Sequence, residues 1–498
     1  MAYTSDDFKT RSIIAMGLAA MSIISGCALS SVNPTSNTLI SADPEIAACF
    51  ATYEEDDDLI SGMGTRDAQD HVIAGYPFLR TSRFTAALVD RLHGAEARAM
   101  WIDRLSALDE DARTIEHLNF PDRVEPPVAS AAELRRCRSA MKRFVLANEA
   151  AFRQVVEHAV VPDRYRSWAR GLGVYPLSSW FVLQGVKRLH DRDGGSFMTS
   201  REPNCCDSDQ KYSLQQRSIS SPSPEARTDF ALDSLGIPII SDSLLAELLM
   251  RHSPIWSIDT RSDNDQIGTV MHDGNEPFVS VDRPSIYSQL THTTFGGKVL
   301  AQLNYTIWFA QRQPQGVFDM LGGRIDGLTW RVTLNHLGEP LIADAMHNCG
   351  CYYMAFPTPR LRLQPQVSGV EEPLWIPKML SGLDGARLQI SVSSNTHYIK
   401  DIEYVSDHTI STQLSQVAYN QLRTLSSTDG ENASMFTQHG LVKNTERAER
   451  WLLWPMGVVS AGSMRQQGHH AIAFVGRRHF DDQDLLDRNF TRRAASAP

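Results

Sequence analysis

Residues 299–309 read VLAQLNYTIWF, and this stretch decides the fold of the chain. Apolar side chains alternate in it with polar or mixed ones, which is the pattern of a strand with one buried face. The alternating positions are Val299, Ala301, Leu303, Tyr305, Ile307 and Phe309. Trp330, Val332 and Leu334 repeat this period, so we expect a second strand there. The turn Asn335–Gly338 then leads into a third expected strand, which begins at Pro340.

A further pair of strands is predicted beyond these three. Apolar residues recur over 388–392 and again over 399–404, on either side of Ser394-Asn395. Strands joined by short turns pair in the antiparallel direction. We therefore predict an α+β fold, in which residues 228–498 form a domain with a mainly antiparallel sheet and flanking helices.

The region before this domain follows a helical period instead. Phe84, Leu88 and Leu92 recur at steps of four, and similar stripes continue along residues 43–193, which we predict to be a helical domain. Residues 194–227 are rich in Ser, Pro, Gln and charge and are predicted to be a flexible linker. The adjacent Cys205 and Cys206 lie in this linker, either as a strained disulfide ring or as two unrelated thiols.

The overall charge and the motif content narrow the function. The formal net charge is −10 and no block of basic residues occurs, which argues against nucleic acid as a partner. The motifs of serine hydrolases, zinc proteases, phosphate-binding loops and haem attachment are missing from the sequence. None of these familiar catalytic classes is therefore indicated.

The N-terminus has the order of an export signal. Lys9 and Arg11 precede a run of small and apolar residues over 13–24, which is shorter than the ~20 residues of a membrane-spanning helix. Ile24-Ser25-Gly26-Cys27 closes the run and resembles the lipobox of bacterial lipoproteins. The alternative is a buried N-terminal helix that ends by chance in a cysteine.

The lipobox resemblance implies cleavage before Cys27 and a lipid on its sulfur. Residues 1–26 would then be a lipoprotein signal peptide, and 27–42, rich in Ser, Thr, Asn and Pro, a lipidated tether. Ala28 follows the cysteine, which by resemblance to sorting in enteric bacteria implies the outer membrane, facing the periplasm. Residues 287–480 also look like uncharacterised proteobacterial lipoproteins, a resemblance that implies no activity.

Six cysteines remain besides Cys27, enough for three disulfides in an oxidising compartment. Cys49 and Cys137 both lie in the predicted helical domain and are the candidate pair. Connectivity cannot be read from sequence, so the other pairings stay open.

The strongest chemical constellation is His347-Asn348-Cys349-Gly350-Cys351, which continues the third predicted strand. His347, Cys349 and Cys351 would share one face and are ligand types that zinc or copper sites use, so we consider zinc as a cofactor. In a straight strand the outer two are ~13 Å apart, so Gly350 would have to bend the chain. A strained Cys349–Cys351 disulfide and two small buried residues are the alternatives.

Other candidate sites are weaker. His292 opens the first strand beside Gly296-Gly297 and is the first partner we would test for His347, while His397, His439, His469 and His470 are also available. Asp259, Asp263 and Asp265 form either a calcium loop or, as we favour, a solvated acidic turn. The charges of residues 446–450 are expected to pair with one another along a helix.

We expect a membrane-anchored envelope lipoprotein that binds an envelope protein or has a structural role. The first alternative is a metal-dependent enzyme built on the His347–Cys351 strand. The second is a thiol redox protein that uses the same cysteines.

Overall fold

The computed structural model describes residues 43–121, 129–199, 209–214, 229–316, 319–365, 371–381, 386–405, 412–427 and 430–493. Cys27, the predicted signal peptide and tether, and Cys205-Cys206 lie outside these residues. Within the described ranges, none of the helices combines the length and the apolar character that crossing a bilayer requires.

Six strands form the larger sheet, in the order β11-β10-β9-β8-β7-β16. Their bounds are Ser285–Phe295 for β7, Lys298–Arg312 for β8, Gly323–Leu334 for β9, Pro340–His347 for β10, Met354–Pro357 for β11 and Ser415–Ala418 for β16. All neighbours are antiparallel except β16, which runs parallel to β7. The three strands predicted from residue 299 onward are therefore β8, β9 and β10.

Five strands form the second sheet, in the order β14-β13-β4-β3-β15. These are β3 (Asp209–Ser213), β4 (Ile255–Asp259), β13 (Arg387–Val392), β14 (Ile399–Val405) and β15 (Thr412–Gln413). The predicted hairpin is the antiparallel pair β13–β14, whereas β13 pairs parallel to β4 and β15 pairs parallel to β3. Together with the helical part, these sheets confirm the predicted α+β class.

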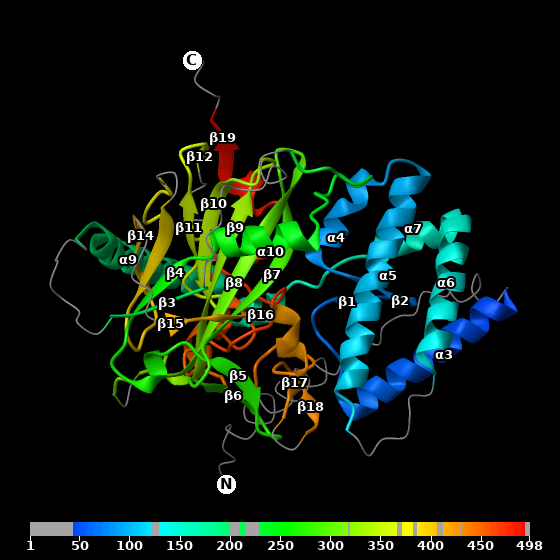
Figure 1. Ribbon diagram of the computed structural model, residues 1–498, viewed down its shortest axis with the longest axis horizontal. Coiled ribbons are helices and arrows are strands. Elements are labelled where there is room, and N and C mark those ends of the chain that lie inside the picture. Colours follow the sequence, from blue (N-terminus) through cyan, green and yellow to red (C-terminus); the bar gives the residue numbers. More distant parts are fainter. Residues whose placement is uncertain are drawn as a thin grey trace, which may run out of the picture.

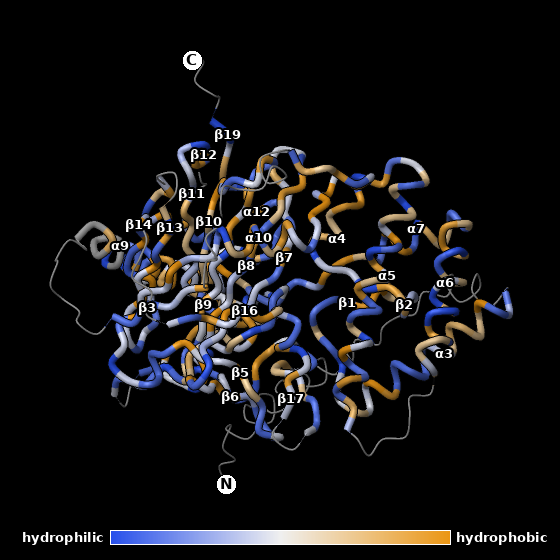
Figure 2. Tube along the Cα trace, viewed as in Figure 1, coloured by the Kyte–Doolittle hydropathy of each residue, from blue (hydrophilic) through white to orange (hydrophobic). Residues whose placement is uncertain are grey.

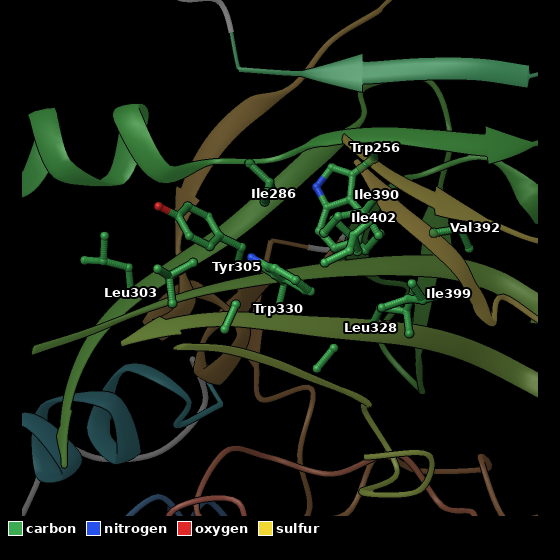
Figure 3. Close-up of a cluster of buried hydrophobic side chains, with 14 of the residues drawn as sticks. Trp256, Ile286, Leu303, Tyr305, Leu328, Trp330, Ile390, Val392, Ile399 and Ile402 are labelled. Carbon is green, nitrogen blue, oxygen red and sulfur yellow. The ribbon is translucent and has the colours of Figure 1, made fainter. Parts of the chain in front are cut away.

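The two sheets pack face to face around the main core. Leu303 and Tyr305 of β8 and Trp330 of β9 lie in this core together with Trp256 of β4 (Figure 3). The side chains point inward because successive residues of a strand alternate between its faces. The core residues of β8 are the ones that the period-two pattern placed on one face.

Helices gather to one side of the two sheets (Figure 1). They are α3 (Pro44–Met63), α4 (Arg83–Ala87), α5 (Gly94–Leu118), α6 (Ala131–Ala147) and α7 (Glu149–His158), with the hairpin β1 (His71–Ile73) and β2 (Tyr76–Thr81) among them. Hydrophobic and hydrophilic stretches alternate along α3 and α5 (Figure 2), as expected for helices with one buried face. The structure joins Cys49 of α3 to Cys137 of α6 in a disulfide, which is the pair singled out in the sequence.

Part of the predicted linker belongs to the folded core. Strand β3 lies inside residues 194–227 and pairs with β4 and β15, and its Tyr212 is 2% exposed. Helix α9 (Tyr175–Thr199) also continues past the predicted boundary at 193. The linker prediction is wrong at these residues, because one buried aromatic side chain can hold a short strand that its polar neighbours do not reveal.

The described residues also form a number of shorter elements. Their bounds are Leu88–Arg91 for η1, Ser167–Leu172 for α8, Asp242–His252 for α10, Asp263–Asp265 for η3, Thr269–His272 for β5, Pro277–Ser280 for β6, Leu361–Leu363 for β12, Tyr419–Arg423 for η4, Leu425–Ser426 for β17, Asn432–Ala433 for β18, Arg450–Leu453 for α11, Trp454–Met456 for η5, Leu485–Asn489 for α12 and Phe490–Arg492 for β19. Helix α10 contributes Leu248 to the core between the sheets.

A buried arginine ties the helical side to the sheet side. Arg423 of η4 is 1% exposed and places Nη2 2.7 Å from Oδ2 of Asp67, and it also pairs with Asp111 of α5. Its backbone carbonyl accepts a hydrogen bond of 2.8 Å from Asn119. The two parts therefore share a buried ion-pair cluster.

Candidate functional site

Asp326 and His347 are brought together at one end of the β8–β9–β10 ladder. Asp326 of β9 lies opposite Phe309 of β8, and His347 of β10 lies opposite Leu328 of β9. Both side chains are buried, and Nδ1 of His347 is 3.7 Å from Oδ1 of Asp326. A carboxylate in this setting needs a compensating partner, because an isolated buried charge is costly.

His397 supplies the closest partner of Asp326. It follows β13 in a tight turn at a φ of 52°, and its ring stacks on Phe309 with centroids 3.9 Å apart. Its Nδ1 is 2.7 Å from Oδ2 of Asp326, and its Nε2 is 3.6 Å from Oδ1 of Asp265. The imidazole is therefore held between two carboxyl groups from different elements, β9 and η3.

The charges of this cluster fix its protonation. Burial lowers the pKa of His397, but the hydrogen bonds and charges of Asp265 and Asp326 outweigh burial and leave that pKa raised. Burial raises the pKa of Asp326, but His347 and His397 outweigh it and hold that pKa well below its usual value. Burial lowers the pKa of His347, and Asp326 only partly offsets this effect. These shifts favour the charged form of His397, the ionised form of Asp326 and the neutral form of His347.

Aromatic rings enclose His347 on the side away from Asp326. Tyr352 and Tyr398 stack with centroids 3.9 Å apart, and the His347 ring meets both edge-on. The guanidinium of Arg312 lies 5.2 Å above the ring of Tyr398. Nε2 of His347 is buried and, within the described part of the chain, has no hydrogen-bond partner. This nitrogen is available to a ligand or a water.

The chain leaves strand β10 at His347 and turns sharply. The N–H of His347 donates to the carbonyl of Cys351 at 3.0 Å, and the N–H of Gly350 donates to the carbonyl of His347 at 2.7 Å. Gly350 has a φ of 90°, and a Cβ there would lie 2.5 Å from the carbonyl oxygen of Ala471. Only glycine fits this position, for conformation and for space alike. The bend at Gly350, which was the condition for bringing His347 and the cysteines close together, is therefore present, and the strand ends before the cysteines.

This turn places the two cysteines against each other. Both are free, Cys349 is buried, and Cys351 is partly exposed. The N–H of Cys351 donates to Sγ of Cys349 at 3.3 Å, and the two thiols also share a side-chain hydrogen bond. We name Cys349 and Cys351 the thiol pair.

A carboxyl group and a guanidinium flank the thiol pair. Burial raises the pKa of Glu449 to about 7, although Arg312, Arg447 and Arg465 partly oppose this. The hydrogen bond to Cys349 and burial raise the pKa of Cys351 well above its usual value, and the charge of Glu449 adds to this, while Arg465 lowers it. Arg465 also donates through Nε to the carbonyl of Cys349 at 2.9 Å. The charge of Glu449 and the hydrogen bond to Cys349 therefore both favour the protonated form of the Cys351 thiol.

Asn348 fixes the base of the turn. Its side chain accepts from Oγ1 of Thr329 at 2.7 Å, and its N–H donates to the carbonyl of Gly327 at 2.9 Å. A Cβ at Gly327 would lie 2.3 Å from the amide nitrogen of Asn348, so only glycine admits this contact. The small cavity that Asn348 and Arg465 help to line has room for about one water.

The structure does not assemble the metal site predicted from the sequence. Over the described ranges, no three His, Cys, Asp or Glu side chains are grouped so that they could hold a metal ion. Across the sheet, His347 of β10 is level with Leu328 of β9 and Ile307 of β8. His292 of β7 pairs instead with Ala301, six residues away from Ile307 along β8, and its ring stacks on Phe84 with centroids 5.1 Å apart. His292 is therefore remote from His347, and its neighbours come from the helical side.

The acidic loop and the charged segment have other roles than expected. Asp265 is not a solvated acid: burial raises its pKa, but hydrogen bonds from His397 and Asn395 outweigh burial and lower it to about 2. Arg447 is 3% exposed and donates to the backbone carbonyls of Arg324 and Ile325 instead of pairing along a helix. The expected helical charge pairs were wrong here, because helix α11 begins only at Arg450.

Sequence reasoning missed Asp326 and Glu449. The sequence holds one signal for Asp326. Counting back in twos from Trp330 along β9 leads to Leu328 and then to Asp326, which puts this carboxylate on the face that carries the buried apolar residues. The sequence holds no such signal for Glu449, because the charged residues around it at 446–450 are typical of an exposed surface. No protein-family model, curated protein or solved structure matches this chain, so its own geometry carries the functional argument.

Proposed function

We propose that the protein is an envelope lipoprotein, anchored to the outer membrane through Cys27 and facing the periplasm, and that its sheet domain exchanges thiols and disulfides. The anchor rests on the lipobox-like residues 24–27. Two acyl chains are the minimum for stable anchoring, and a diacylated cysteine provides them. The exchange partner is a thiol or disulfide of another envelope protein.

The contact within the thiol pair is the observation that carries the exchange activity. Cys349 and Cys351 are free, hydrogen-bonded to each other and held by a turn that only glycine at position 350 permits. Cys351 is partly exposed, whereas Cys349 is buried, so we expect a second molecule to meet Cys351 first. This is the division of labour between an attacking and a resolving thiol.

The exchange balances in two steps. Cys351 loses its proton to water and attacks a sulfur of the partner disulfide, so that a mixed disulfide forms and one partner thiolate leaves and takes up a proton. Cys349 then loses its proton and attacks the sulfur of Cys351, and the second partner thiol leaves. The partner is reduced by two electrons, and a Cys349–Cys351 disulfide is formed.

Redox titration of the full-length protein tests this proposal. The protein is equilibrated in mixtures of reduced and oxidised glutathione, its free thiols are alkylated, and the alkylated peptides are identified by mass. We expect Cys349 and Cys351 to lose their label together and reversibly, while the Cys49–Cys137 disulfide stays oxidised throughout because its residues are buried.

Two variants sharpen the test. Cys349→Ser should arrest exchange at the mixed disulfide on Cys351, whereas Glu449→Gln removes a negative charge that raises the pKa of Cys351 and should therefore speed the first step. The matched control is Glu431→Gln, at a carboxyl group far along the chain from the turn. The proposal fails if both thiols stay fully alkylated in oxidised glutathione. It also fails if zinc alone protects them from alkylation, which would favour a metal site.

A further inference from the structure

Exposed aromatic side chains gather in one region of the molecule. Every Trp and Phe that is exposed among the described residues lies on or beside α8, α9, α11 and η5. Trp451 is 72% exposed, Phe181 is 62% exposed and Trp168 is 60% exposed. We name as the aromatic patch the residues Trp168, Leu172, Val174, Leu177, Trp180, Phe181, Trp451, Leu452 and Trp454.

The patch is assembled from two distant parts of the sequence. Nε of Arg170 in α8 donates to the carbonyl of Met456 at 2.8 Å, and the N–H of Arg166 donates to the carbonyl of Gly457 at 2.8 Å. Gly173 approaches so closely that a Cβ there would lie 2.4 Å from Cβ of Pro455. Segments 166–181 and 451–457 therefore form one continuous surface.

Packing beneath the patch keeps its side chains facing outward. Leu183 of α9, Met456 of η5 and Val475 form a small core of their own. The N–H of Gly476 donates to the hydroxyl of Tyr175 at 2.8 Å. With the inner positions filled, the exposed rings cannot turn inward, because side chains in a packed core leave little free volume.

The charge around the patch is opposite to that of the chain. Residues 163–193 contain six Lys or Arg and three Asp, a surplus of three positive charges, although the whole chain has a net charge of −10. Two arginines lie directly beside patch rings, Arg450 at 5.0 Å from Trp451 and Arg166 at 5.9 Å from Trp168. Exposed Lys187 and Arg188 follow on α9. The patch is thus apolar and aromatic, with a cationic margin.

We propose that the aromatic patch docks onto the surface of a bilayer that contains anionic phospholipid. Trp and Phe insert at the boundary between headgroups and acyl chains, and Lys and Arg beside them are attracted to anionic headgroups. Aromatic rings with a cationic margin match the chemistry of an anionic lipid surface, which is why we favour a bilayer as the occupant. The docking surface is independent of the lipid on Cys27 and goes beyond the proposed exchange activity.

Docking would also orient the thiol pair. Glu449 immediately precedes α11, so the carboxyl group beside Cys351 is one residue away from the start of a patch helix. A molecule lying on its patch would hold this turn at a fixed height above the lipid. Exchange partners anchored in the same membrane, with their own thiols at the same distance from the lipid, could then reach the thiol pair.

Tryptophan quenching by brominated lipid tests the docking of the full-length protein. The protein is mixed with vesicles of phosphatidylcholine, with and without a quarter of phosphatidylglycerol, that carry bromine on the acyl chains. We expect quenching in the anionic vesicles, because Trp168, Trp180, Trp451 and Trp454 would lie near the bromines, and parallel protection of these residues from aqueous acrylamide. The triple variant R166E/K187E/R188E keeps every tryptophan and should lose the quenching.

The matched control is Arg261→Glu, which reverses an exposed charge on the loop after β4 and should quench like the wild type. Equal quenching of wild type and triple variant would overturn the proposal, as would full acrylamide accessibility in anionic vesicles. Protection without vesicles, together with a dimer in solution that the triple variant dissolves, would assign the patch to a second copy instead. The glutathione titration of the thiol pair needs no membrane, so the two proposals fail separately.

Discussion

At the scale of single residues, the carboxylate of Asp326 holds the site together. It faces two imidazoles at once, and one of them, His397, is itself shared with Asp265. Such a cluster stabilises the fold only while all its members keep their charge states, since an uncompensated buried charge is costly.

The stability of the protein should therefore depend on pH through this cluster. The folded pKa of Asp326 is depressed, so its contribution is present above the unfolded pKa of ~4 and is lost as the pH falls through the folded value. The folded pKa of His397 is raised, so its contribution is complete below the unfolded pKa of ~6.5 and is lost as the pH rises through the folded value.

Asp326→Asn should remove most of this dependence. We expect the free energy of unfolding to fall by about 3–5 kcal/mol near pH 5.5, where both contributions are present, and by less in strong acid. Urea unfolding across the pH range measures it, with Asp273→Asn at an exposed carboxyl group as the control. A loss that is equal at every pH would contradict this account of the cluster.

At the scale of elements, the disulfide links α3 to α6 across 88 residues of chain. Closing so long a loop lowers the entropy of the unfolded chain, so we expect the double variant C49A/C137A to lose about 2–5 kcal/mol of stability. Calorimetric melting of the variant measures this loss, and Cys349→Ala serves as a control that removes a buried thiol without opening a loop. An unchanged melting temperature would show that packing alone holds α3 against α6.

The elements also show how far the sequence could predict this structure. The strand from Val299 was predictable because one face is buried and the period is two, and the hairpin β13–β14 followed from the same rule. Strand β3 could not be predicted, because its mostly polar residues have the composition of a linker and its partner strand β15 lies about 200 residues away in the sequence. For the site, the sequence indicated His347 and the two cysteines, but the meeting of Asp326 with His397 depends on packing between two sheets.

At the scale of the whole molecule, Arg423 joins the helical side to the sheet side. Its partners Asp67 and Asp111 belong to the helical side, and Asp67 is 7% exposed. Removing the cation takes the ion-pair partner away from the buried Asp67 carboxylate, and breaking a buried pair in this way costs about 3–5 kcal/mol.

Arg423→Met should thus separate the unfolding of the two sides. We expect the helical side to melt first and calorimetry to resolve two transitions in the variant. The control is Arg324→Met, which removes an exposed arginine paired with Glu276. If Arg423→Met melted in a single transition at the wild-type temperature, as the control should, the ion pairs would not couple the two sides.

The position of β3 has a consequence for the order in which the chain can fold. Its two neighbours are β4 and β15, and β4 in turn waits for β13, so the second sheet closes only after residue 413 is present. Pairing between segments so distant in sequence slows folding, because the entropy of closing the loops is lost before the contacts form. A chain that emerges residue by residue would therefore leave Tyr212 and Trp256 uncovered until late in synthesis, and a holding chaperone would be most useful to it during that interval.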